Sequence, residues 1–240
     1  MSDTRLFEKC RAYVTSSAND HGFARNQQVA LPAITLSRQV GARGTTIAKL
    51  LVQHLEQVDE QTNPPWTLFD KNLIRRVLDD HQLPRYLEKF MTESRVSELQ
   101  STINEIVGLH PSMWELHEKV GDTIVRLLGR GHAIIVGRGA CVVGAGLRNV
   151  LNVRLVGSVK HRLQHLENLF GLCEKEAADR LLKDDRDRRD YFRTHFGRDI
   201  EDPELYHLVI NTDMLSEEEI VRIIASAALR RMQVPAELAL

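Results

Sequence analysis

The segment from Ala33 to Leu50 places a short apolar run, a glycine-containing loop and a helical pattern directly after one another. The run Ala33–Leu36 is typical of a buried strand. After the loop, apolar residues recur at helical spacing, at Ile47, Leu50, Leu51 and Leu55. A strand that leads through such a loop into a helix presents backbone N–H groups and a helix N-terminus, which together can bind phosphate. The segment therefore predicts either a phosphate-binding loop or a plain tight turn between a strand and a helix.

The loop from Ser37 to Thr46 departs from the phosphate-loop pattern G-x-x-x-x-G-K-S/T at its most important position. Anchoring the pattern on the strand end puts its two glycines at Arg38 and Arg43 and its lysine at Gly44. Arg43 is then the nearest cation, and a guanidinium can bind two phosphate oxygens at once, although it is bulkier than an ammonium. The residues predicted to bind phosphate are Ser37, Arg38, Gly41, Ala42, Arg43, Gly44, Thr45 and Thr46.

The composition argues against several classes of protein. The chain has 240 residues, enough for one large domain or for a core with a small appendage. Its formal net charge of -1 creates no overall positive field, so we expect no nucleic-acid partner. The sequence has no apolar run near the roughly 18 residues of a membrane span and no apolar signal core, so we expect a cytoplasmic protein without a membrane partner. The three cysteines form no CxxC pair, which argues against a zinc site.

Four further strand patterns follow the first one along the chain. They lie at Trp66–Asp70, His132–Val136, Leu151–Val156 and Leu205–Ile210. Helical patterns occupy 71–80, 84–104 and 111–129, and a last one at 216–232 begins with a capping box of Ser216 and Glu219. Five short strands alternating with helices predict a three-layer α/β domain with a five-stranded parallel sheet. Ligands of such sheets bind at the carboxyl ends of the strands, where Asp70 and Arg138 are expected.

The chain divides into an arm and one domain. Residues 1–30 carry a short amphipathic helix pattern followed by a polar stretch, and residues 31–240 form the predicted domain. Residues 71–130 are too many for a simple crossover between two strands, so we interpret them as a helical insertion on the acceptor side. The arm and the insertion are the two candidate surfaces for a homodimer.

Residues 183–203 hold the densest charge cluster and allow two interpretations. Lys183–Asp190 alternates acids with arginines, as in an exposed helix stabilised by ion pairs. The segment from Phe192 to Pro203 has few aliphatic residues and contains Gly197, which favours a mobile lid. Arginines on a closing lid supply the positive charge that phosphoryl transfer requires. We therefore predict an arginine-rich lid over residues 183–203.

The segment Ile34–Lys49 resembles the opening "ITISRQxGSGG…IAK" of the cytidylate kinase-like family, a branch of the nucleoside monophosphate kinases. The resemblance continues in the same order and covers about residues 32 to 228. Its further segments are Phe69–Ile74, Ile134–Ala140, Asp185–Phe192 and Asp202–Thr212. The resemblance implies a P-loop kinase fold, in which the loop would hold the phosphates of ATP and Mg²⁺ would act as the cofactor.

The resemblance also implies roles for individual residues. Arg43 would be the cation beside the lysine position, and Arg186 and Arg188 would be the cations of the lid. Asp70 would orient the acceptor or a magnesium-bound water, and Arg138 would contact the acceptor. Established cytidylate kinases have Gly-Arg-Asp where this chain has Gly137-Arg138-Gly139, so a carboxylate that could read the base is missing.

These roles lead to one main hypothesis and two alternatives. The main hypothesis is transfer of the γ-phosphoryl group of ATP to a nucleoside monophosphate, with CMP or dCMP as the first candidate acceptors. The first alternative is a nucleotide-binding regulatory protein that has lost efficient catalysis, because the loop lacks its lysine. The second is a kinase for another small molecule, whose pocket the helical insertion would shape.

Overall fold

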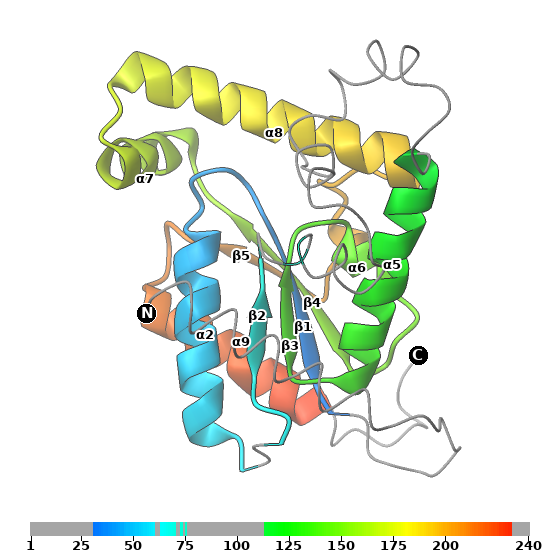
Figure 1. Ribbon diagram of the computed structural model, residues 1–240. Helices are drawn as coiled ribbons and strands as arrows, with labels where there is room; N and C mark the ends of the chain where they lie inside the picture. The colour runs from blue at the N-terminus through cyan, green and yellow to red at the C-terminus, as the bar shows by residue number, and fades with distance from the viewer. Residues whose placement is uncertain (1–30, 61–62, 71–72, 74, 76–112, 232–240) are drawn as a thin grey trace.

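The computed structural model describes residues 31–60, 63–70, 73, 75 and 113–231. Five strands form one sheet in the order β2-β3-β1-β4-β5, and all neighbouring strands are parallel (Figure 1). The strands are β1 (Ala33–Arg38), β2 (Thr67–Phe69), β3 (Ala133–Val136), β4 (Val150–Val156) and β5 (Leu208–Asn211). This confirms the predicted α/β fold with a five-stranded parallel sheet.

Helices cover both faces of the sheet because the central strands are apolar on both sides. Ile34 and Leu36 pack in one buried cluster with α2 (Gly44–Val58) and α9 (Glu217–Arg231). Ala33 packs in a second cluster with α5 (Met113–Arg130) and with the start of the short helix α6 (Ala140–Val143). Alternation along one strand therefore supplies both cores, and the domain has the three predicted layers.

Two further helices are placed beyond the carboxyl ends of the strands. After β4 the chain forms α7 (Val159–Phe170) and then the long helix α8 (Glu174–Phe196). Figure 1 shows α8 running across the molecule over the edge where β1, β3 and β4 end. The short 3-10 helix η3 (Pro203–Leu205) leads from α8 back to β5. The helix that carries the arginine-rich segment thus covers the edge of the sheet where ligands of α/β proteins bind.

Most of the described helices and strands agree with the sequence patterns, and two do not. The capping box of Ser216 and Glu219 is present, with the Ser216 hydroxyl accepting from the Glu219 N–H at 3.3 Å. The last strand begins at Leu208, because Pro203–Leu205 is a 3-10 helix rather than strand. Residues 192–196 belong to α8 and are not part of a loop. The arm (1–30) and the helical patterns at 84–104 lie outside the described residues, as does most of 71–80.

Aromatic residues replace the aliphatic anchors that the lid segment lacks. Tyr191, Phe192, Ile200 and Tyr206 are buried together with Cys141, and Phe196 packs against them. This part of the segment is therefore packed by aromatic side chains, and the lid over residues 183–203 stays a prediction. Aromatic side chains bury large apolar areas, so a segment with few aliphatic residues can still be firmly packed.

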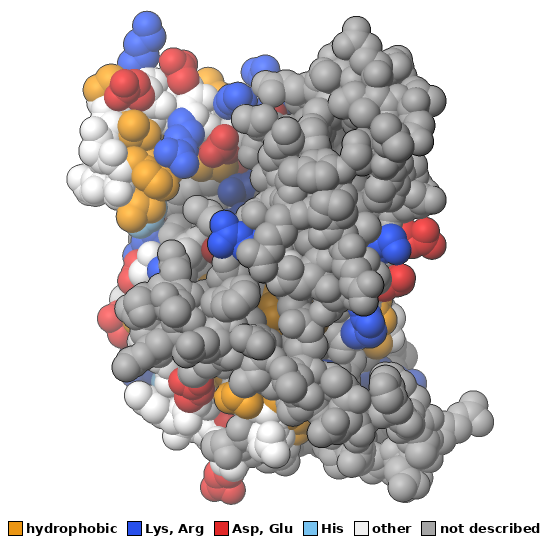
Figure 2. All heavy atoms as spheres, viewed as in Figure 1, with side chains coloured by type: hydrophobic (Ala, Val, Ile, Leu, Met, Phe, Trp, Pro, Cys, Tyr) orange, Lys and Arg blue, Asp and Glu red, His pale blue; other side chains and the backbone are white. Residues whose placement is uncertain are grey.

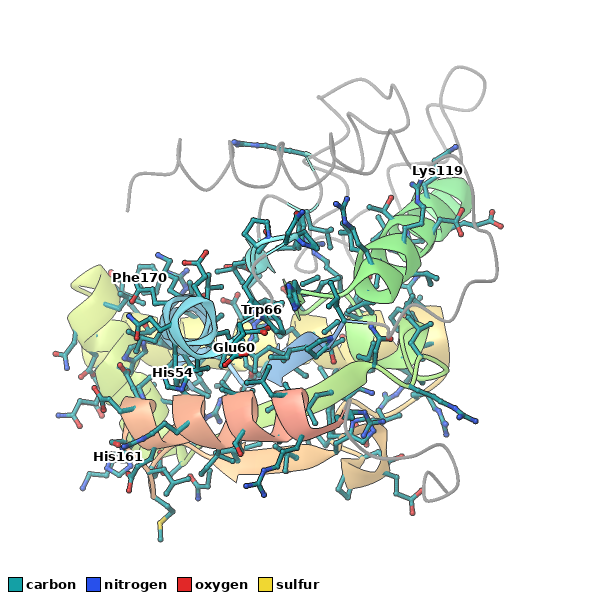
Figure 3. The ribbon with its side chains drawn as sticks, turned by 90° about the horizontal axis from the view of Figure 1, so that it is seen from below. His54, Glu60, Trp66, Lys119, His161 and Phe170 are labelled. Atoms are coloured by element: carbon teal, nitrogen blue, oxygen red, sulfur yellow. The ribbon has the colours of Figure 1, made fainter. Side chains whose placement is uncertain are left out.

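The surface of the domain is mixed in charge. Figure 2 shows Lys and Arg interspersed with Asp and Glu on the visible described surface, and apolar side chains gathered near α7 and the start of α8. Leu169, Phe170 and Leu182 are the exposed apolar residues of this corner. In Figure 3, Trp66 lies toward the interior, whereas His161 and Phe170 lie at the periphery. Within the described ranges, none of the helices combines the length and hydropathy of a membrane span.

Candidate functional site

The loop between β1 and α2 leads into the start of a long helix. Arg43 is the N-cap residue, and its left-handed backbone (φ 55°) turns the chain from the loop into α2. Its side chain makes no capping hydrogen bond, and the first turn of α2 contains no acidic residue. The first N–H groups of a helix have no partner within the helix, and they carry its partial positive charge. The start of α2 can therefore bind an anion.

Arg162 of α7 fixes the shape of this loop from beneath. Its guanidinium donates to the carbonyl oxygens of Val40 at 3.1 Å and Gly157 at 3.0 Å. The backbone of Arg162 also lies so close to Gly41 that an added Cβ would be 2.5 Å from the Arg162 carbonyl oxygen. Gly41 has a φ of +77°, so glycine is needed there for space and for conformation.

Asp185 of α8 joins the same network. Its carboxylate accepts a hydrogen bond from the Val40 N–H at 2.8 Å and forms an ion pair with Arg162 at 2.6 Å. Both side chains are largely buried, with 7% of Arg162 and 14% of Asp185 exposed. The arginine-rich helix is therefore attached to the phosphate-loop candidate by a buried charge pair.

Arg43 contacts the opposite side of the loop from Arg162. Its guanidinium donates to the carbonyl oxygen of Thr212, and to that of Leu215 at 3.3 Å. It also lies 3.6 Å from the Glu217 carboxylate. These contacts attach the start of α2 to the chain between β5 and α9. The role of Arg43 as a phosphate ligand stays a prediction.

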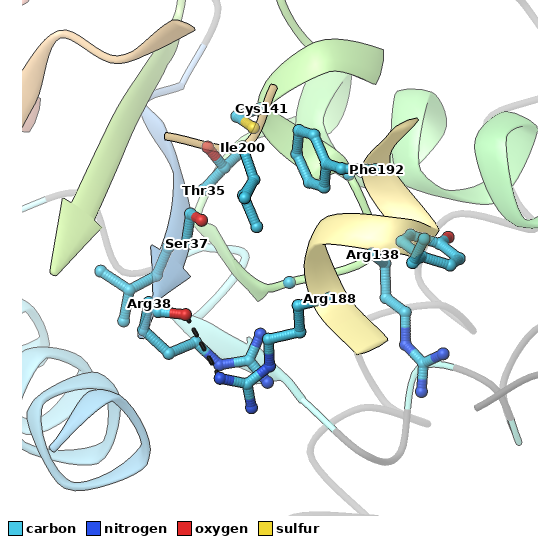
Figure 4. Close-up of a pocket in the computed structure, with 12 residues that line it drawn as sticks. Thr35, Ser37, Arg38, Arg138, Cys141, Arg188, Phe192 and Ile200 are labelled. Atoms are coloured by element: carbon cyan, nitrogen blue, oxygen red, sulfur yellow. Dashed lines mark hydrogen bonds between the residues drawn. The ribbon is translucent and has the colours of Figure 1, made fainter. Parts of the chain in front are cut away.

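A shallow hollow opens at the carboxyl ends of β1 and β3, beneath α8. We call it the main hollow; its lining includes Ser37, Arg38, Arg138, Cys141, Arg188 and Phe192. Figure 4 shows Arg38 and Arg188 at one end and Cys141, Ile200 and Phe192 at the other. The Arg188 guanidinium donates to the Arg38 carbonyl oxygen at 3.3 Å. The main hollow thus has a cationic end and an apolar end.

The turn after β3 gives the main hollow part of its wall. Gly137, Arg138 and Gly139 all have left-handed backbone, with φ values of 77°, 59° and 65°. Arg138 is the only non-glycine residue of the three, and such a conformation is uncommon outside glycine. Arg138 lines the main hollow together with Arg188, and its contact with an acceptor stays a prediction.

A second hollow lies beside the first and shares Arg38, Arg188 and Ile200 with it. Its lining residues are Arg38, Gln39, Arg154, Asp185, Arg188, Arg189, Ile200 and Glu201. Arg154 stands out because only 4% of it is exposed. Its guanidinium donates to the Ser37 hydroxyl at 3.1 Å and lies over the Tyr206 ring at 5.6 Å. Among the described residues, no carboxylate forms an ion pair with it.

Burial keeps the neutral groups around Arg154 protonated. It raises the pKa of the Tyr206 hydroxyl to about 12 and that of the Cys141 thiol to about 11. The Tyr206 hydroxyl donates to the Ile200 carbonyl oxygen at 2.8 Å and lies 3.3 Å from the Ser37 hydroxyl. A thiol with a raised pKa is a poor nucleophile, so Cys141 is not suited to covalent catalysis. A buried cation without a carboxylate partner is costly, and a bound anion would offset that cost.

The structure brings together only part of the predicted site. Arg38, Arg138 and Arg188 line the main hollow, and Gly41 to Thr46 form the loop and the first turn of α2. Asp70 is half-buried at the carboxyl end of β2 but lines neither hollow. Arg186 is exposed and likewise lines neither, because it lies two residues from Arg188 and points to another side of α8.

Arg154, Arg162 and Asp185 are candidate site residues that the sequence patterns did not single out. Arg154 carried a usable signal, since it is a charged residue inside an otherwise buried strand. Asp185 lay inside the charge cluster at 183–190 but was not singled out, and Arg162 carried no such signal, because charged residues on helices are usually solvated. The contacts of Arg162 on α7 and Asp185 on α8 with the loop are seen only in the tertiary structure.

Comparisons with known proteins were made for the sequence and for the structure. The search of curated proteins finds no match. An uncharacterized protein from Eubacterium ventriosum has a crystal structure similar to this one, with a TM-score of 0.60 and 16% identity. The alignment covers 82% of this chain and 98% of that one, and it shows a common fold.

Two shikimate kinases also align with this chain. The enzyme from Bacteroides thetaiotaomicron gives a TM-score of 0.44 at 14% identity, with 85% of this chain and 100% of that chain covered. The enzyme from Acinetobacter baumannii, in complex with shikimate, gives 0.45 at 17% identity, with 83% and 93% covered. The sequence itself matches the cytidylate kinase-like family over residues 33–214. The chain therefore belongs to the cytidylate kinase-like family.

Proposed function

We propose that this protein transfers the γ-phosphoryl group of ATP to a nucleoside monophosphate, with CMP or dCMP as the first acceptors to test. The observation that supports this proposal most directly is the group of arginines from β1, β4 and α8 around the two hollows, beside the start of α2. Family membership supports a kinase activity in general. Phosphoryl transfer needs many positive charges and no covalent intermediate, which agrees with the residues present.

Each part of the site has a separate task in this proposal. The N–H groups at the start of α2 hold the phosphates of ATP. Arg188, on α8, neutralises charge on the migrating group, and Arg138 contacts the acceptor phosphate from the turn after β3. Fixed cations that are aligned before the reaction stabilise the transition state without reorganising. The buried pair of Arg162 and Asp185 keeps α8 and the loop in a constant relative position.

Mg²⁺ is the metal that this reaction implies, and the oxygen donors at this edge of the sheet are of the type it prefers. The Thr46 hydroxyl, on the first turn of α2, and the Asp70 carboxylate, after β2, would hold it together with substrate phosphates and water. The ion would supply further neutralisation of phosphate charge.

A kinase for another small molecule is the second candidate, and one observation favours it. Gly139 stands where established cytidylate kinases have an aspartate, and an added Cβ at Gly139 would overlap the Phe196 ring. The place of the base-reading carboxylate is therefore filled by an apolar ring. An acceptor without a nucleobase would not need that carboxylate.

The test is ATP consumption by purified protein with Mg²⁺ against CMP, dCMP, UMP, AMP, GMP and a blank without acceptor. Calorimetry on the same sample follows nucleotide binding. Turnover above the blank with one acceptor supports the proposal and names the substrate. Binding without turnover supports the regulatory alternative. An Arg43→Ala protein that folds correctly and turns over normally would refute a catalytic role for Arg43.

A further inference from the structure

Gly44 occupies the lysine position of the phosphate loop, and the structure shows what fills the space of its missing side chain. A Cβ built on Gly44 would lie 2.9 Å from Cγ, 3.2 Å from Cβ and 3.5 Å from Cδ of Arg38. Gly44 itself is buried and is the first residue of α2. The aliphatic part of the Arg38 side chain therefore lies against the start of the helix, where a lysine side chain would otherwise begin.

The two side chains exclude each other at this point. The contact of 2.9 Å involves Cγ, which is close to the backbone of Arg38 and cannot swing away as a side-chain end can. A lysine at position 44 would thus displace Arg38, and Arg38 in its present position requires glycine at 44. The packing of Arg38 at the end of β1 therefore accounts for the absence of a lysine at position 44.

Arg43 does not take this place in the structure. Its guanidinium contacts the carbonyl oxygens of Thr212 and Leu215 and faces the Glu217 carboxylate. Arg38, in contrast, lines both hollows. Of the two arginines that flank the loop, Arg38 is the one that lines the hollows.

The surroundings of Arg38 suit an anion. Arg188 lies at its carbonyl oxygen, and both arginines line the second hollow with Arg154. Arg154 is buried without a carboxylate partner among the described residues. The carboxylates of Asp185 and Glu201 also line this hollow, but its arginines outnumber them, so a phosphate group there would meet a net positive charge.

We propose that Arg38 replaces the missing lysine of the phosphate loop, with its aliphatic part crossing Gly44 and its guanidinium binding the phosphates of the donor nucleotide. This inference rests on the proposed function. The guanidinium offers two parallel donors to phosphate oxygens, whereas a lysine acts as a single compact charge. The exchange of lysine for arginine thus moves the cation from the first residue of α2 to the last residue of β1.

The test uses the full chain and inorganic tripolyphosphate, whose binding calorimetry measures. Arg38→Met keeps an apolar side chain over Gly44 and removes only the charge. Arg38→Ala combined with Gly44→Lys restores a cation from the other residue, and Gly44→Ala keeps Arg38 but displaces it. Arg126→Met, on the exposed face of α5, is the matched control. Circular dichroism and the Tm of each variant check that it is folded.

We expect Arg38→Met and Gly44→Ala each to weaken tripolyphosphate binding by about tenfold or more, as for the loss of a charge-assisted hydrogen bond. The exchange of both residues should restore affinity to within about threefold of the wild type, and Arg126→Met should bind normally. Unchanged binding by Arg38→Met, or no recovery in the double variant, would overturn the inference while leaving the proposed function standing. A wild type that binds no tripolyphosphate would overturn both.

Discussion

The ring of Phe196 lies directly against the backbone of Gly139, leaving no room for a side chain at that position. Phe196 is the last residue of α8, and Gly139 ends the turn after β3. The contact therefore joins the arginine-rich helix to the wall of the main hollow. It also means that only glycine fits at residue 139 in this packing.

Replacing Gly139 with aspartate should destabilise the protein. The left-handed backbone costs about 1–2 kcal/mol for a residue with a side chain, and overpacking against Phe196 adds about 1–3 kcal/mol. Urea denaturation of Gly139→Asp measures the sum. Gly146→Ala is the control, because the space around Gly146 is open. A Gly139→Asp protein as stable as the wild type would contradict the packing described here, and adding Phe196→Ala should recover part of the loss.

Breaking the pair of Arg162 and Asp185 should cost much more than breaking an exposed pair. Arg162→Met leaves the Asp185 carboxylate buried without its partner, and such a loss costs about 3–5 kcal/mol. The pair of Arg180 and Asp184 is exposed on α8, so Asp184→Ala should cost less than about 1 kcal/mol. Urea denaturation compares the two variants. If the double variant Arg162→Met with Asp185→Leu is no more stable than Arg162→Met alone, the explanation is wrong.

Arg154→Met should separate stability from anion binding. Arg154 is a buried charge with no carboxylate partner in the described part of the chain, so its removal also removes its desolvation cost, and the Tm should stay the same or rise. Binding of inorganic phosphate or tripolyphosphate should weaken by about tenfold, because one charge-assisted hydrogen bond is lost. Thermal denaturation and calorimetry on the same sample give both numbers. A large drop in Tm with unchanged anion affinity would assign Arg154 a structural role instead.

The stability of the protein should fall between neutral and mildly acidic pH because of His195. Its ring stacks on that of His117 at 3.8 Å and lies 4.7 Å from the Tyr191 ring. Burial, together with the nearby His117, lowers the pKa of His195 from 6.5 to about 4. Between pH 6.5 and pH 4 the unfolded chain therefore binds a proton at His195 that the folded chain does not bind. The contribution of neutral His195 to the free energy of unfolding is full above pH 6.5 and is lost as the pH falls toward 4.

His195→Gln tests this linkage. The Tm of the wild type should drop further between pH 7 and pH 5 than the Tm of the variant, since the variant has no proton to exclude at residue 195. Equal drops in Tm for the two proteins would show that His195 does not contribute to the pH dependence.

The core elements were predictable because their signals are local. The apolar runs at Ile34, Ile134 and Val153 are buried on both faces of a parallel sheet, and that requirement is visible in each strand alone. The helix from Glu217 begins at a capping box whose two residues are three apart. The last strand was predicted to begin at Leu205, but Leu205 ends a 3-10 helix and the strand begins at Leu208. The local sequence is compatible with either structure at Leu205 and Tyr206.

The site was predictable only in part, for a different reason. The sequence indicated a loop at Ser37–Thr46 and arginines near Arg138 and Arg188, since these positions follow strands or lie in a charge cluster. It pointed to Arg43 as the cation nearest to the lysine position. It had no means of showing that the Arg38 side chain would cross Gly44, because that contact depends on the direction of the side chains.

The sequence by itself determined the α/β class, the parallel sheet and the position of the loop, because periodicity and glycine placement act over a few residues. Only the tertiary structure decided which charges share a space. Arg154 from β4 and Asp185 from α8 reach the loop across more than a hundred residues of chain, and Phe196 covers Gly139 from another helix. Contacts between residues so far apart depend on how the helices pack on the sheet. Local sequence patterns do not predict that packing.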